Sequence, residues 1–235
     1  MKIIPKNIFL FFSKIAVVYF ICSVILVLIF KWFDPPITSF IQSELNEKKL
    51  VSIMPVRVKQ NWINLNEISS KVLLAVVASE DQKFFDHWGF DVDEIVKAVE
   101  EFEDKNKLRG ASTLTQQVSK NLFLFPSKNF IRKGFEAYYT FLIELFWSKK
   151  RIIEVYLNIA ELGPSTFGVS AGSRYHFHKP ASDLNSDEAA YLAAILPNPG
   201  RYKSNERTNY INRRIEKIKR QMYLIGGEQL LKENL

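Results

Sequence analysis

The sequence contains very little cysteine and histidine, and this limits the chemistry that it can carry. Cys22 is the only cysteine and lies inside an apolar N-terminal stretch. The rest of the chain therefore has no disulfide and no thiolate metal site. His176 and His178 form an H-x-H pair, but no third ligand is evident near them. We therefore predict no metal site from these histidines.

Glycine motifs that bind nucleotides are also missing. The nine glycines form neither a P-loop nor a Rossmann fingerprint, and the chain shows no internal repeat. A nucleotide-sugar donor bound in the usual α/β manner is therefore disfavoured.

Acidic residues are absent before Asp34, so the formal charge of +7 is unevenly distributed. Lys2, Lys6, Lys14 and Lys31 contribute four positive charges, and the remaining 28 lysines and arginines exceed the 25 acids by only three. That remainder forms no dense basic stripe of the kind that binds a phosphate backbone. We predict no nucleic-acid partner.

One long hydrophobic run is present, from Ile15 to Phe30, and Ser23 is its only polar residue. With its apolar flanks it approaches the ~20 residues that cross a bilayer. Three lysines precede it and one follows, which predicts a cytoplasmic N-terminus. A cleaved signal peptide is the alternative, but no small-x-small cleavage site precedes Asp34. We predict an uncleaved single-pass anchor at residues 1–33.

The remaining chain reads as a connector, residues 34–62, followed by one mainly α domain, residues 63–235. Val56, Val58 and Trp62 are expected on the domain surface. Apolar periodicity and capping residues predict the helices, with Asn66 or Ser69 capping the first and Ser148 the fifth. The expected ranges are about 66–80, 91–104, 110–124, 129–147, 149–160, 186–196 and 205–224.

A first candidate site lies where an apolar run ends in two carboxylates, Glu80 and Asp81. Phe84, His87 and Trp88 follow closely. A carboxylate that is partly removed from water beside aromatic rings is suited to take up and return a proton. The alternative is an exposed Glu-Asp pair that closes a helix.

A second candidate site combines amides and cations. Thr113, Gln116, Gln117 and Lys120 recur at three- and four-residue spacings, which places them on one side of a helix. Such a face suits an oxyanion or a diphosphate, although it could also be a solvated polar face. The run from Leu122 to Phe125 could be core, or a ridge that dips into the bilayer.

The next predicted helix carries two cations and an acid. Arg132 and Lys133 lie in its first turns, and Glu136 follows Arg132 by four residues. The acid could simply pair with Arg132 on an exposed face. Glu154 and Asn158 are likewise four residues apart, and either a structural role or a place in a substrate groove is open for them.

Five blocks of sequence resemble the monofunctional biosynthetic peptidoglycan transglycosylases of glycosyltransferase family 51, in the order typical of that family. The similarity covers roughly Val51 to Met222. The blocks are EDQKFFDHWG (80–89), GASTLTQQVSKN (110–121), RKGFE (132–136), KKRIIEVYLN (149–158), and GVSAGSRYHFHK (168–179) with LPNP (196–199). Ala111, Ser173 and His176 depart from frequent family residues, and none of them touches the implied chemistry.

The resemblance implies a lysozyme-like, two-lobed catalytic domain that polymerises lipid II into β-1,4-linked glycan strands. It implies that Glu80 is the general base and that undecaprenyl diphosphate leaves in one inverting displacement. Glu136 matches a second essential glutamate. Its role is open between orienting Arg132 and Lys120, holding a divalent cation such as Mg or Mn, and tuning Glu80.

The resemblance also implies a substrate-binding set and a cellular setting. No cofactor is required, and the expected location is the inner membrane with a periplasmic catalytic domain. Lipid II, the growing strand and the membrane are the expected partners, and proteins of cell-wall synthesis or division could join them. A lysozyme-like hydrolase and an inactive membrane scaffold are the rival readings. The substrate-binding residues would be Ser112, Gln116, Gln117, Lys120, Asn121, Arg132 and Lys133, with Asp81, Phe84 and His87 shaping the loop after Glu80.

Overall fold

Helices make up most of the fold, as the periodicity predicts. The computed structural model describes residues 6–51, 58–105, 110, 112–127, 129–202 and 204–235. Three short strands, β1 (Lys59–Gln60), β2 (Glu161–Gly163) and β3 (Thr166–Phe167), form a sheet in the order β1-β3-β2. The helices are α1 (Lys6–Trp32), α2 (Ser39–Val51), α3 (Ser70–Glu80), α4 (Val92–Lys105), α5 (Leu114–Phe123), α6 (Phe130–Phe146), α7 (Lys149–Ile159), α8 (Val169–Phe177), α9 (Ser186–Ile195), α10 (Asn209–Leu224) and α11 (Gly227–Asn234), with 3-10 turns at Leu65–Glu67, Ala181–Asp183 and Pro199–Arg201.

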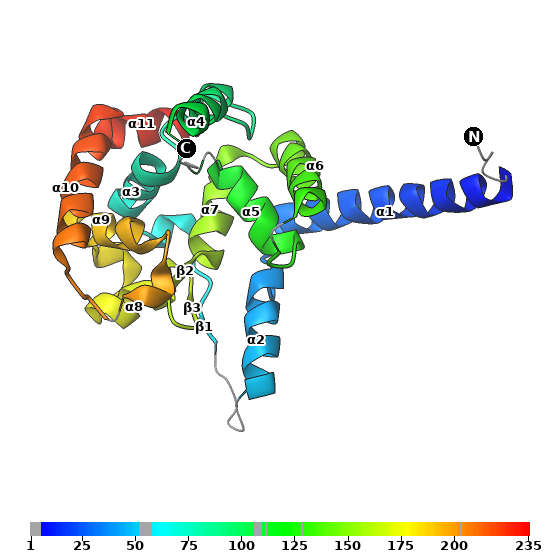
Figure 1. The fold of residues 1–235 in the computed structure, drawn as a ribbon. Helices are drawn as coiled ribbons and strands as arrows, with labels where there is room; N and C mark the ends of the chain where they lie inside the picture. Colours follow the sequence, from blue (N-terminus) through cyan, green and yellow to red (C-terminus); the bar gives the residue numbers. More distant parts are fainter. Residues whose placement is uncertain (1–5, 52–57, 106–109, 111, 128, 203) are drawn as a thin grey trace.

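The helices form two groups that share one continuous core (Figure 1). In the first group, α3, α9, α10 and α11 pack together, and every residue of α3 from 72 to 78 is buried. The second group consists of α1, α2, α5, α6 and α7. Because α3 and α5 belong to different groups, the residues at the end of α3 lie where the two groups meet.

All seven predicted helices are present, and α3, α5 and α10 begin about four residues later than expected. Ser148 caps α7, because its Oγ accepts from the Arg151 N–H (3.2 Å). Ser69 precedes α3 without capping it through its side chain, since its Oγ donates instead to the Leu184 carbonyl (2.9 Å). The last long helix begins at Asn209 rather than near 205, because Thr208 caps it.

The stretch expected to be a connector contains α2, a helix that the sequence analysis did not predict. Thr38 and Ile41 are buried, and the Ser39 hydroxyl donates to the Leu122 carbonyl at the end of α5 (2.8 Å). Trp62 is partly buried against the core rather than lying free on the surface. Val56 lies outside the described residues. The packing of α2 on α5 explains why this segment is helical.

Helix α1 is long and apolar enough to be a single-pass membrane anchor, with a candidate span from Leu10 to Trp32. Its N-terminal part projects away from the other helices (Figure 1). Its C-terminal half lies along α6, where Ser23 Oγ and Tyr138 Oη are 2.5 Å apart and Trp147 Nε1 donates to the Val27 carbonyl (2.8 Å). The anchor is therefore joined to the rest of the protein by side-chain contacts as well as by the chain itself.

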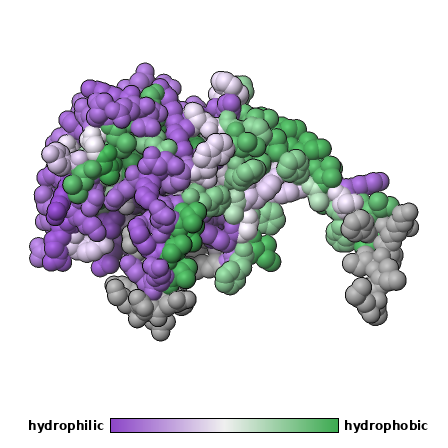
Figure 2. Space-filling model, turned by 90° about the horizontal axis from the view of Figure 1, so that it is seen from above, coloured by the Kyte–Doolittle hydropathy of each residue, from purple (hydrophilic) through white to green (hydrophobic). Residues whose placement is uncertain are grey.

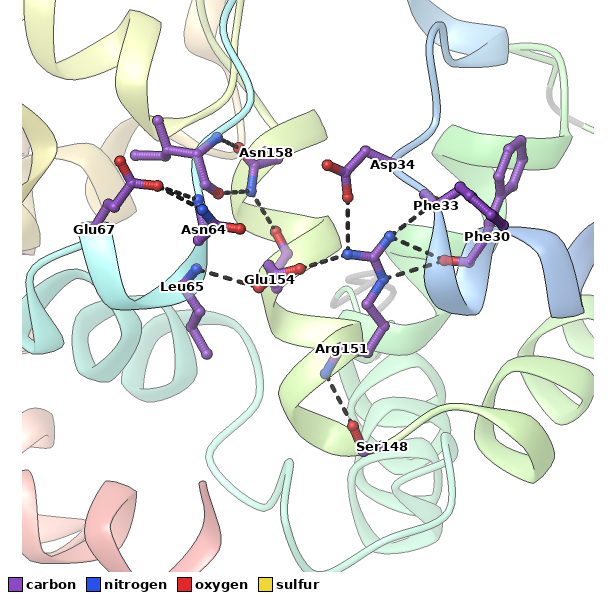
Figure 3. A network of polar contacts seen from close by, with 11 residues as sticks. Phe30, Phe33, Asp34, Asn64, Leu65, Glu67, Ser148, Arg151, Glu154 and Asn158 are labelled. Carbon is purple, nitrogen blue, oxygen red and sulfur yellow. Dashed lines mark hydrogen bonds and ion pairs between the residues drawn. The ribbon is translucent and has the colours of Figure 1, made fainter.

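Arg151 on α7 holds the end of α1 (Figure 3). Its Nη2 donates to the carbonyls of Phe30 (3.0 Å) and Phe33 (2.9 Å), and its Nη1 donates to Asp34 Oδ1 (3.0 Å). The last carbonyls of a helix have no partner within the helix, and a cation there also complements the helix dipole. Arg151, on α7, thus supplies hydrogen-bond donors for the unpaired carbonyls at the C-terminus of α1.

Glu154 and Asn158 extend the same network toward α3 (Figure 3). Glu154 Oε2 accepts from the Leu65 N–H (3.2 Å), while Asn158 bonds both backbone groups of Ile63 (3.0 and 2.9 Å). Asn158 is completely buried. Of the two readings left open, the structure therefore supports the structural role for these residues.

Exposed apolar side chains gather on the half of the molecule that carries α1 (Figure 2). The run from Leu122 to Phe125 is mostly core, since Leu122 and Leu124 are buried and the Phe123 ring stacks on Tyr139 (4.4 Å between centroids). The exposed ridge lies instead along α6. Its exposed large side chains are Phe130, Ile131, Phe135, Phe141 and Leu145, with Phe125 just before the helix.

Candidate active site

Glu80 is the last residue of α3, and its carboxylate receives two hydrogen bonds. Gln117 Nε2, from α5, donates to Oε2 (3.0 Å), and Ser79 Oγ donates to Oε1 (3.3 Å). The side chain is half-buried. Glu80 is therefore oriented by both groups of helices while remaining open to solvent, which excludes the reading as an unconstrained exposed acid.

Asp81 joins the loop after Glu80 to the start of α5. Its Oδ2 accepts from the Leu114 N–H (3.0 Å), and its Oδ1 accepts from His87 Nε2 (2.8 Å). A carboxylate at a helix N-terminus is stabilised by the unpaired N–H groups and the dipole there. Phe84 is fully buried, with Lys149 Nζ 4.8 Å from its ring centroid. The structure thus places Asp81, Phe84 and His87 as supports of the loop, with Phe84 inside the core.

Gly89 allows this loop to lie close to α6. Its φ is +75°, and a Cβ there would come within 2.7 Å of Thr140 Cγ2. Lys149 Nζ donates to the His87 carbonyl (2.6 Å) and to Glu144 Oε1 (2.8 Å). Sequence reasoning did not single out Glu144 or Lys149, although Lys149 begins one of the five blocks quoted above.

Glu136 lies at the centre of a cationic cluster on α6 and is only 2% exposed. Arg132 Nη1 donates to its Oε2 (2.7 Å), and Lys133 Nζ donates to its Oε1. Lys133 also reaches Ser112 Oγ (3.4 Å). The reading as a pair on an exposed face therefore does not hold, because the acid is buried and neutralised by two cations.

Lys120 on α5 is the third cation of the site, and its Nζ lies 5.4 Å from the ring centroid of Phe40. Burial lowers the pKa of Lys120 below the usual value of a lysine, and the carboxylate of Glu136 partly offsets this effect. Arg132 and Lys133 lower the pKa further, while Glu80 raises it. Lys120 is thus within electrostatic range of both glutamates and both other cations.

Replacing Lys120 with methionine is expected to raise the melting temperature at neutral pH by a few degrees. A lysine whose pKa is lower in the folded state destabilises the fold wherever it is charged there. The gain should disappear as the pH rises through that lowered pKa toward ~10.4, the value in the unfolded chain. In a chain of this size about 2–4 °C corresponds to 1 kcal/mol. Thermal melts of both proteins between pH 7 and 10.5 measure the difference, and a gain independent of pH would contradict this explanation.

The two glutamines of α5 have different surroundings, although their spacing made them look equivalent. Gln116 is 5% exposed, and its Oε1 accepts from the Thr113 N–H (3.0 Å) in a capping box. Gln117 instead reaches Glu80. Asn121 lies half-buried on the last turn of α5. Gln117 thus donates to Glu80 and Gln116 completes the helix cap, and donation by either of them to a diphosphate stays a prediction.

A polar cavity of about 340 Å³ opens beside Glu80. Ser112 lines this cavity and also contacts Lys133, so the cavity and the cationic cluster adjoin. Glu80 therefore lines a cavity that meets the cluster of Glu136, Arg132 and Lys133 at Ser112. The other residues that line the cavity are Ser79, Asp81, Gln82, Lys83, Asp91, Glu94, Lys97, Gly110 and Thr113.

His176 of the H-x-H pair has a structural role. His176 is buried, its Nδ1 accepts from the Asn205 N–H (3.1 Å), and its Nε2 donates to the Leu162 carbonyl (2.6 Å). Burial lowers the pKa of His176, which favours this neutral form. Within the described ranges, no three His, Cys, Asp or Glu residues form a group that could hold a metal ion.

Comparisons with known proteins identify the family of this chain. A family described as Transglycosylase matches residues 46–223. A protein of Pseudomonas syringae pv. syringae is 45% identical over 212 residues, covering 89% of this chain and 88% of its own. One of Shewanella oneidensis is 44% identical over 230 residues and 97% of each chain, and one of Pseudomonas putida is 46% identical over 217 residues and 92% of each. All three are named biosynthetic peptidoglycan transglycosylase. The chain therefore belongs to the transglycosylase family, and it is a peptidoglycan glycosyltransferase of cell-wall synthesis.

Proposed function

We propose that the enzyme polymerises lipid II and that Glu80 is its general base. The acceptor's 4-hydroxyl gives its proton to Glu80, and the oxygen attacks C1 of the donor sugar. The bond from C1 to undecaprenyl diphosphate breaks, so an α linkage becomes a β-1,4 linkage in one displacement. The observation that supports this most is the oriented carboxylate of Glu80 in a polar cavity that adjoins the cationic cluster at Lys133.

The cations suit the leaving group. Diphosphate leaves as an anion, so it needs positive charge and hydrogen-bond donors more than it needs a strong acid. Lys120, Arg132 and Lys133 supply the charge, and Ser112 is a neutral donor beside Lys133. Burial of Lys120 strengthens its attraction to an anion, because the local dielectric is lower than that of water.

Glu136 is proposed to hold Arg132 and Lys133 in place. Each of its two oxygens already contacts one of these cations, so the carboxylate is a poor fit for a resident metal ligand. Glu136 would then be a positioning residue beside the diphosphate site. On this proposal Mg or Mn is not required, although such an ion could accompany the diphosphate itself.

The membrane setting follows from α1 and α6. The exposed apolar side chains of α6 lie on the same half of the molecule as the candidate membrane span (Figure 2). We propose that α6 dips into the bilayer and keeps the cleft at the level of the lipid diphosphate. The excess of lysine before the span supports a cytoplasmic N-terminus and a periplasmic domain at the inner membrane. Residues 63–235 would be the catalytic domain, and contacts with other cell-wall proteins are part of the proposal.

Purified full-length enzyme in detergent is expected to form polymer from lipid II and to release no soluble muropeptides from sacculi. The two substrates separate synthesis from lysozyme-like hydrolysis. Chromatography of both reactions gives the answer. Muropeptides from sacculi without any polymer would establish a hydrolase, and inactivity on both would favour the inactive scaffold.

A further inference from the structure

Two hydrogen-bond relays converge on Glu80, one on each carboxylate oxygen. The donors to Glu80 are Gln117 and Ser79, and each of them is itself held by a second residue. Tyr156 Oη, on α7, donates to Gln117 Oε1 (3.2 Å). Arg214 Nη2, on α10, donates to Ser79 Oγ (3.4 Å). The relays thus come from α7 and α10, one from each group of helices.

The Tyr156 hydroxyl decides which way the Gln117 amide faces. Tyr156 is almost completely buried, and burial raises the pKa of its hydroxyl far above the usual value, so it stays protonated and can donate. A donor at Gln117 Oε1 leaves Nε2 directed at Glu80. The opposite orientation would place the amide oxygen against a carboxylate, with no proton between them.

Arg214 is partly buried behind Ser79, in contrast with its neighbour Arg213, which is exposed. Ile211 and Ile215 are buried beside it and fix this face of α10 toward α3. The Nε of Arg214 is buried and has no hydrogen-bond partner in the described part of the chain. The guanidinium donates through Nη2 to Ser79, the residue that precedes Glu80 and donates to it.

We propose that Tyr156 and Arg214 are positioning residues for the base, through Tyr156–Gln117–Glu80 and Arg214–Ser79–Glu80. The inference rests on the proposed role of Glu80. With a donor on each oxygen the carboxylate cannot rotate freely, and Glu80 is held where it lines the cavity. Rates depend steeply on such geometry, since a misplacement of about 1 Å can cost ~10²-fold.

Tyr156→Phe tests the first relay, because it removes one hydroxyl and leaves the core filled. We expect kcat on lipid II to fall about tenfold, as for the loss of one oriented hydrogen bond, with KM within twofold of wild type. In a Gln117→Ala background the same substitution should cost no further activity, because the relay is already broken. A substitution that acted through general stability would lower kcat equally in both backgrounds, and that result would overturn the proposal for Tyr156.

Arg214→Ala tests the second relay, with Arg213→Ala as the matched control on the same helix. We expect about a tenfold loss of kcat for Arg214→Ala, a smaller loss for Arg214→Lys and none for Arg213→Ala. In a Ser79→Ala background Arg214→Ala should add nothing. If Arg214→Ala does not fold, Arg214→Gln takes its place in the same cycle.

The outcomes separate this inference from the proposed function. Full activity of both variants beside an active wild type overturns only the relays. A higher KM at unchanged kcat would make Arg214 a substrate-binding residue and overturn its positioning role. A wild-type enzyme that forms no polymer overturns the proposed function instead.

Discussion

Replacing Glu80 with glutamine is expected to reduce glycan polymerisation by about 10³-fold, within the range found for the loss of a general base. The amide has the size of the carboxylate; its oxygen can still accept from Gln117 while its NH2 group donates to Ser79 Oγ, so the fold should be unchanged. It cannot take the proton of the acceptor hydroxyl. Turnover should therefore fall while donor binding persists.

The measurement pairs initial rates on lipid II with binding of fluorescent undecaprenyl diphosphate to the same variant. Glu216→Gln is the matched control, because Glu216 is exposed on α10, pairs with Lys219 and does not line the cavity. It should behave as wild type. A Glu80→Gln enzyme that polymerises at more than about a tenth of the wild-type rate would remove Glu80 from the mechanism.

Local periodicity was enough to predict most of the helices. Ile211, Ile215, Ile218 and Met222 recur at helical spacing and are all buried on α10. Helix α2 lacks such a stripe, and its described buried side chain is Ile41. It is helical where α5 packs on it, and a contact between residues about 80 apart leaves no trace in local spacing.

The candidate site was predictable where its residues are neighbours on one helix. Arg132 and Glu136 are four residues apart and do form an ion pair. The supporting contacts were not predictable, because they join distant segments: Lys149 to the His87 carbonyl and Arg214 to Ser79 span 62 and 135 residues.

The role of Gln116 could have been predicted from a local sequence motif. Thr113 and Gln116 have the spacing of a capping box, in which the first and fourth residues bond each other's backbone. That motif uses Gln116 at the start of α5 and leaves Gln117 for the cleft. Spacing along a polar face cannot separate the two, whereas the capping motif can.

Replacing Glu136 with glutamine is expected to lower kcat/KM for lipid II by about 10²-fold, because two cations lose the carboxylate that holds them. Arg132 and Lys133 would then turn toward solvent, and the diphosphate would meet a less ordered site. The fold should also lose stability, since removing one partner of a buried ion pair costs about 3–5 kcal/mol. Because 48% of the Lys133 side chain is exposed, its ion pair is screened by solvent. We therefore expect the loss of stability to lie at or below the lower end of that range.

Titration with Mg²⁺ and Mn²⁺ decides between this role and that of a metal ligand. A ligand-deficient site would need more metal, so excess ion would restore the activity of Glu136→Gln. If the carboxylate only orders Arg132 and Lys133, the deficit should stay constant at every metal concentration. Asp93→Asn is the control, because it breaks an exposed ion pair with Lys83 and should change neither activity nor stability by much. Recovery to within about threefold of wild type at millimolar metal would show that Glu136 binds the ion. Added metal cannot replace the negative charge that Arg132 and Lys133 lose with the carboxylate, so it would not rescue a purely ordering role.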